Sequence, residues 1–71
     1  MAEQSLRDRF VDLLISRVAN DHYPSGTMMD QIERAMTDEH RDRYVQQLIK
    51  HIADDRYPSP DLIRRVALLV R

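Results

Sequence analysis

Residues 6–25 of this chain, LRDRFVDLLISRVANDHYPS, return 34 positions later as residues 40–59, HRDRYVQQLIKHIADDRYPS. Of the 20 aligned positions 11 are identical, where chance would give roughly one or two. Similarity of this extent at one fixed offset indicates an internal duplication. We therefore expect one domain, residues 1–71, that contains two copies of a single unit, over about 6–36 and 40–70.

Each copy has the apolar pattern of two helices. In its first part, apolar residues recur at spacings of three and four, which is typical of one face of an α-helix. A second, shorter helix with the same periodicity follows the Tyr-Pro-Ser sequence. The sequence therefore predicts an all-α fold of four helices arranged as two tandem αα-hairpins, with the helices near 5–21, 26–36, 38–55 and 60–71.

The sequence Asp-x-Tyr-Pro-Ser stands at the bend of each predicted hairpin. Proline disfavours the α conformation in the residue before it, and the serine that follows is placed to cap the next helix. We expect the tyrosines to pack across the bend and the aspartates to bond to the turn backbone or to an arginine. Alternatively, the two turns form an acidic, aromatic recognition surface. The residues concerned are Asp21, Tyr23, Pro24, Ser25, Asp55, Tyr57, Pro58 and Ser59.

The unequal helix lengths restrict how the hairpins can assemble. At 1.5 Å per residue, the first helix of each hairpin reaches about 25 Å and the second about 16 Å. The second helix can therefore cover only part of its partner's apolar stripe. It leaves uncovered Phe10, Val11, Tyr44 and Val45. Either the other hairpin covers these residues, which gives a pseudo-twofold four-helix domain, or a second chain does.

Composition sets further limits. The chain has 71 residues, a net charge of −1 and no cysteine, so neither disulfides nor thiolate metal ligands can stabilise it. No apolar run approaches the roughly 18 residues of a membrane span and no signal-peptide core follows Met1, so we expect a cytoplasmic protein without membrane contact. Ten arginines against one lysine suggest a GC-rich, bacterial genome. The period matches that of the tetratricopeptide repeat, but the Trp, Gly and Ala positions of that repeat are missing.

Motifs for nucleic acid, metal and catalysis are weak. Arg64 and Arg65 in the last helix have only Asp61 beside them, so a DNA-binding regulator that uses this helix is the alternative function. His51 and Asp55 could share a helix face, but no third metal ligand is evident. No motif places a nucleophile or a phosphate-binding loop. We therefore expect no cofactor and no enzymatic activity, with a ligand-binding or catalytic bundle as the second alternative.

The differences between the copies point to a protein partner. Leu13 stands where the second copy has Gln47, and Leu68 stands where the first copy has Arg34. Both are thus apolar where the shared fold tolerates a polar residue. We predict a protein–protein interaction module, a small adaptor or regulator whose contact surface contains Leu13, Leu68 and Val70, with a homodimer through the last helix as one form. Leu68→Asp should then break association and leave the helices intact.

Overall fold

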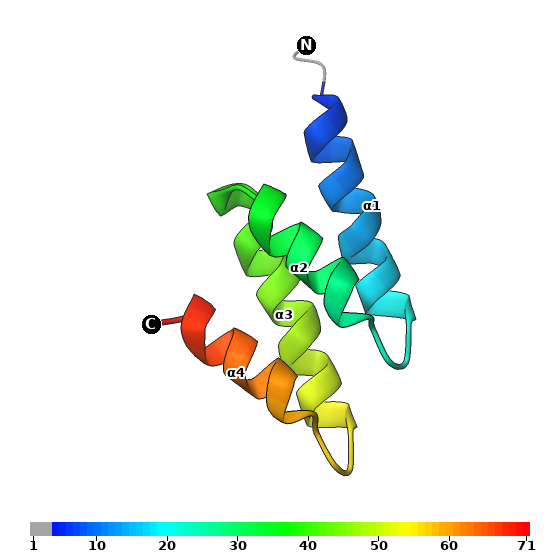
Figure 1. Cartoon of the computed structure of the whole chain (residues 1–71), viewed down its shortest axis with the longest axis vertical. Coiled ribbons are helices and arrows are strands. Elements are labelled where there is room, and N and C mark those ends of the chain that lie inside the picture. Colours follow the sequence, from blue (N-terminus) through cyan, green and yellow to red (C-terminus); the bar gives the residue numbers. More distant parts are fainter. Residues whose placement is uncertain (1–3) are drawn as a thin grey trace.

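The computed structural model describes residues 4–71, and within this range the chain forms four α-helices and no strand (Figure 1). The all-α class predicted from the sequence is confirmed, and each helix begins and ends within two residues of its predicted bounds. None of the four helices is both long enough and apolar enough to cross a membrane. They are α1 (Leu6–Asn20), α2 (Gly26–Ala35), α3 (Asp38–Asp54) and α4 (Pro60–Leu69).

The serine caps predicted after each Tyr-Pro step are present. Ser25 accepts a hydrogen bond from the backbone N–H of Met28 at 3.1 Å at the start of α2. Ser59 accepts one from the backbone N–H of Asp61, also at 3.1 Å, at the start of α4, where Pro60 occupies the first helical position. These bonds satisfy amide groups that have no partner inside the helix, which is why both short helices begin where they do.

The two tyrosines of the turns do not pack across the bends, so this prediction was wrong. The exposed fraction of Tyr23 is 79% and that of Tyr57 is 83%. Below the first bend, the core is already filled by Val18 from the last turn of α1 and by Met29 from the first turn of α2. The backbone leaves the helix before each tyrosine, and the ring lies in solvent.

The aspartates of the turns also differ from expectation. Asp21 and Asp55 have extended backbone and end α1 and α3, and each donates its backbone N–H to a carbonyl four residues earlier. Among residues 4–71, neither carboxylate takes part in a hydrogen bond or an ion pair. The predicted bond to the turn backbone or to an arginine is therefore absent, and both carboxylates are half-buried.

The helices pack as two layers. α1 contacts α2 and α3, and α3 also contacts α4. Figure 1 shows α1 and α3 running side by side in the same direction, while α2 and α4 run back in the opposite direction. In Figure 1, α1 lies on one side of the molecule and α4 on the other. We refer to these two sides as the ends of the helix array.

All four helices contribute to one core. Its members are Val11, Ile15, Val18, Met29, Ile32, Tyr44, Leu48 and Leu62. Val11, Tyr44 and Val45, which a single hairpin leaves uncovered, are buried within this chain, so no second chain is needed to cover them. Phe10 is the exception, because half of its side chain remains exposed.

Candidate functional site

Arg65 is the most deeply enclosed charge of the described residues. Only 7% of it is exposed, and its guanidinium bonds to three carboxylates. Its Nε donates to Asp61 at 2.8 Å, and its Nη1 donates to Asp30 at 2.9 Å and to Glu33 at 2.7 Å. Arg65 and Asp61 belong to α4, whereas Asp30 and Glu33 belong to α2. The bonds from Arg65 to Asp30 and Glu33 therefore hold the two short helices together.

This arrangement bears on the DNA-binding alternative. The five N–H donors of an arginine reach phosphate only if they are free to point outward. The guanidinium of Arg65 points inward to α2 and is neutralised there. Its neighbour Arg64 is exposed, but it bonds to Asp61 at 2.6 Å. Helix α4 thus offers one partly paired arginine where a basic recognition helix needs several.

Tyr44 extends the same network into α3. Its side chain is fully buried, and its hydroxyl donates to Glu33 at 2.6 Å. Burial, together with the nearby charge of Glu33, raises the pKa of Tyr44 well above its usual value of 10, so the hydroxyl remains a donor. Glu33 therefore accepts from two helices at once, from Tyr44 of α3 and from Arg65 of α4.

A second polar cluster joins α3 to α1. His40 is buried, and its Nε2 lies 3.7 Å from Asp8 and 3.6 Å from Asp12. Its Nδ1 accepts the backbone N–H of Thr37 at 3.0 Å, which fixes the ring at the start of α3. Arg43 donates to the same Asp12. No pattern in the sequence predicts this cluster, because its histidine and its aspartates lie about thirty positions apart.

The Asp12 carboxyl shows how strongly this cluster favours the charged form. Partial burial alone would raise the pKa of Asp12. Hydrogen bonds from Gln4 and Arg43 outweigh that effect, and the pKa lies below its usual value of 3.8. The cluster is thus an interhelical ion pair, positioned between α1 and α3.

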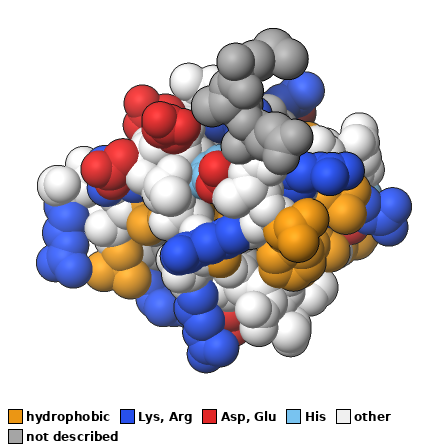
Figure 2. Space-filling model, turned by 90° about the horizontal axis from the view of Figure 1, so that it is seen from above, with side chains coloured by type: hydrophobic (Ala, Val, Ile, Leu, Met, Phe, Trp, Pro, Cys, Tyr) orange, Lys and Arg blue, Asp and Glu red, His pale blue; other side chains and the backbone are white. Residues whose placement is uncertain are grey.

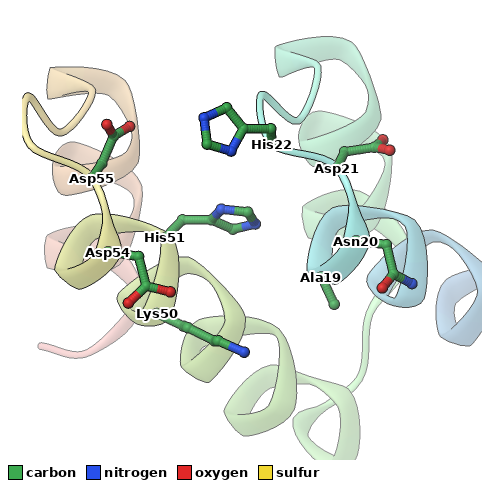
Figure 3. A pocket seen from close by; sticks show the side chains of 8 residues that line it. All are labelled: Ala19, Asn20, Asp21, His22, Lys50, His51, Asp54 and Asp55. Carbon is green, nitrogen blue, oxygen red and sulfur yellow. The ribbon is translucent and has the colours of Figure 1, made fainter.

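A cavity of about 260 Å³ opens between the C-terminal ends of α1 and α3 (Figure 3). Its walls are Ala19, Asn20, Asp21, His22, Lys50, His51, Asp54 and Asp55. His22 and His51 point into the gap, whereas the carboxylate of Asp21 points away from the ring of His22. His51 Nε2 lies 2.6 Å from the carbonyl oxygen of Val18, to which it must donate its proton.

The chemistry of this cavity follows from those orientations. One nitrogen of His51 is used in holding α3 to α1, and Asp55 turns to the opposite side of the gap. The adjacent His22 and Asp21 do not form a catalytic dyad. Within residues 4–71, no group of three His, Cys, Asp or Glu side chains converges as a metal site would require.

Apolar side chains are exposed at both ends of the helix array. At one end, α1 presents Leu6, Phe10 and Leu13, which recur at spacings of four and three and so share one stripe. We call this stripe the α1 face. At the other end, Ile49 of α3, Ile63 of α4 and Val70, which directly follows α4, are exposed. We call this the α3–α4 face. In the view of Figure 2, apolar side chains lie among Lys and Arg side chains toward both the left and the right edge.

The three residues predicted as one contact surface are all exposed, but they lie apart. Leu13 belongs to the α1 face and Val70 to the α3–α4 face, and among the described residues α1 and α4 do not touch. Leu68 is exposed as well, yet at 100° per residue it lies on the side of α4 away from Ile63 and Val70. Comparing the two copies in the sequence selected residues that are exposed. It could not show that Leu13, Leu68 and Val70 lie on three different surfaces.

No protein-family model, no curated protein and no solved structure matches this chain. Its function is therefore argued from its own residues.

We expect acid to remove the stabilisation that Asp61 gives to α4 through its bonds to Arg65 and Arg64. Hydrogen bonds from Arg65 and then Arg64 lower the pKa of Asp61 below its usual value of 3.8. The stabilisation is complete above about pH 4 and is lost as the pH falls through the folded-state pKa, because the unfolded chain binds the proton first. Asp61→Asn should cost about 1 kcal/mol at pH 7, allowing for solvent screening, and progressively less towards pH 3.

Urea denaturation at several pH values measures this effect. Asp54→Asn is the matched control, because Asp54 is exposed and makes no hydrogen bond within residues 4–71. It should keep the wild-type pH dependence. An Asp61→Asn variant whose deficit is the same at pH 7 and pH 3 would show that the carboxylate charge is not what Arg65 recognises.

Proposed function

We propose that this chain is a non-enzymatic protein–protein interaction module, a small cytoplasmic adaptor or regulator. The observation that carries the proposal is the pair of apolar faces, one at each end of the helix array. Stable monomeric proteins rarely expose contiguous apolar surface unless it is used for binding. Tyr23 and Tyr57, exposed at the turns, add aromatic side chains of the kind enriched in interfaces.

We further propose that the module consists of two copies of one hairpin, α1–α2 and α3–α4. The 34-residue repeat supports this, as do the matching serine caps of α2 and α4. The bonds from Arg65 to Asp30 and Glu33 bring α4 beside α2, so both short helices lie on the same side of the α1–α3 layer. That favours hairpins stacked side by side in the same direction over the twofold relation expected from the sequence.

The two alternative functions have less support. In a DNA-binding regulator the guanidinium of Arg65 would have to point outward. Here it is bonded to three acidic side chains. A catalytic or ligand-binding bundle would use the cavity of Figure 3, where the Nε2 of His51 already bonds to Val18. Neither helix α4 as a DNA-binding surface nor the cavity of Figure 3 therefore has as much support as the two exposed apolar faces.

Photo-crosslinking tests the proposed function. A benzophenone amino acid is placed at Leu13, Leu68 or Val70, in turn, and at Ser16 as control, because Ser16 is exposed on the polar side of α1. In a lysate of the cells that express the chain naturally, we expect the yield of protein adducts at Leu13 and at Val70 to be several times the yield at Ser16. An adduct at Leu68 would add a contact through the outer side of α4. Yields no higher at the three leucine and valine sites than at Ser16 would contradict the proposal.

A further inference from the structure

Where the two hairpins pack together, two surfaces of the chain meet. Each of them can be compared with the surface one repeat away, which is exposed. On one side of this contact, α3 presents His40, Tyr44 and His51 to α1 and α2. The residues of α1 that stand 34 positions before these three are Leu6, Phe10 and Arg17. All three are exposed. The α1 face is therefore the repeat counterpart of the surface by which α3 docks.

The other side of the contact also has a free counterpart. Ile15 of α1 lies in the core that all four helices form and is 4% exposed, while Ile49, one repeat later, is 47% exposed. Met29 of α2 is likewise buried, and its counterpart Ile63 is half exposed. The α3–α4 face is thus the surface that receives a following hairpin, and in this chain no hairpin follows within the described residues.

A groove of about 420 Å³ marks the same place on the α3–α4 face. Its lining residues are Arg41, Asp42, Val45, Gln46, Leu69, Val70 and Arg71. The counterparts of Asp42 and Gln46 in the first hairpin are Asp8 and Asp12, the residues that face His40. The groove is therefore where the beginning of a next first helix would lie, and Leu6 is the residue of α1 that matches His40.

The polar groups of the internal contact change together between the copies. Glu33 accepts from Tyr44 and Arg65, and its counterpart on the free face is Ala67. The counterparts of its two donors are Phe10, which lacks the hydroxyl, and Gln31, which lacks the charge. A buried tyrosine hydroxyl or an arginine opposite Ala67 would have no acceptor, and such groups are costly to bury. Each free end thus carries the residues that suit the other.

We propose that a second copy of this chain docks head to tail, with the α1 face of one copy on the α3–α4 face of the next, in the register of the internal hairpin contact. This inference rests on the proposed function and names the partner. The contact repeats the internal geometry but replaces the Tyr44–Glu33–Arg65 network by an apolar contact around Phe10. Because the two faces are different surfaces, the contact is heterologous and leaves a free face at each end.

Complementary variants test this arrangement. Phe10→Asp blocks the α1 face and Ile63→Asp blocks the α3–α4 face; both side chains are half exposed, so we expect the helix content by circular dichroism to stay unchanged. By light scattering, wild-type mass should rise with concentration from 8.4 kDa past the dimer value of 16.8 kDa, twice 8.4. Each variant alone should remain at 8.4 kDa, and an equimolar mixture should stop at 16.8 kDa, since one intact face of each kind remains.

The outcomes separate the possible contacts. Leu68→Asp, which the sequence alone predicts to break association, is here the matched control on α4, because Leu68 lies on the side of α4 away from the α3–α4 face. In head-to-tail docking it should associate like the wild type, whereas a symmetric dimer through the outer side of α4 would be lost. If Phe10→Asp or Ile63→Asp loses helicity, Leu6→Asp and Val70→Asp replace them at the same two faces. A wild-type mass of 8.4 kDa at every concentration, a single variant that dimerises alone, or a mixture that does not, each overturns head-to-tail docking. Crosslinks from Leu13 or Val70 to a different protein would then leave the proposed function standing, and the absence of any adduct would remove both.

Discussion

Arg65→Ala is expected to lower the free energy of unfolding by about 3 kcal/mol. Within residues 4–71, the change removes the one cation that bonds to Asp30, Glu33 and Asp61 together. Asp30 then has no donor, Glu33 keeps only the hydroxyl of Tyr44, and Asp61 keeps only the exposed Arg64. Loss of one partner from a buried ion pair costs about 3 to 5 kcal/mol, and the lower figure applies because the three carboxylates are partly exposed. For a chain of 71 residues, whose whole stability is roughly 4 to 10 kcal/mol, this is a large fraction.

The neighbouring arginine provides the control for this prediction. Arg64 bonds to the same Asp61, but its side chain is 65% exposed. Arg64→Ala should therefore cost no more than about 0.5 kcal/mol, as is usual for surface ion pairs three residues apart on a helix. Both variants are compared with the wild type by urea denaturation at pH 7. Equal losses for the two arginines would mean that the bonds between Arg65 and α2 contribute nothing to the fold.

These two arginines also show where sequence reasoning reached its limit. The helices could be predicted because their signals are local: apolar residues three and four apart, a serine cap, and Pro60 at the first helical position. In the sequence, Arg64 and Arg65 looked alike, each with Asp61 nearby. The groups that distinguish them, Asp30 and Glu33, stand 35 and 32 residues earlier than Arg65 and meet it only after α2 and α4 pack together.

The turns illustrate a second limit. The repeat predicted the position of both bends and both serine caps, because proline and serine act on the backbone beside them. It did not predict the direction of Tyr23 and Tyr57, because that depends on whether space remains in the core below the bend. A tyrosine present in both copies can be needed for packing or for binding. Exposure of both rings now favours their role in recognition over their role in packing.

Ile15→Ala and Ile49→Ala should differ sharply, although the two isoleucines occupy the same position in the two copies. Ile15 lies in the core, and its truncation should cost about 3 kcal/mol through lost apolar burial and the cavity left behind. Ile49 is half exposed, and its truncation in the monomer should cost about 1 kcal/mol or less. Urea denaturation at low protein concentration measures both, in the same host and with the same change of side chain.

The comparison becomes a test of assembly when it is repeated at high protein concentration. If a second copy covers Ile49 in the head-to-tail contact, then Ile49 is buried in the assembled state, and Ile49→Ala should weaken association about tenfold or more. The free energy of unfolding of the wild type should also rise with concentration, because binding that favours the folded state adds to its stability. For Ile15→Ala the deficit should stay constant with concentration, because its cover is supplied by its own chain. A deficit of Ile49→Ala that also stays constant would place Ile49 at a free end that no copy covers.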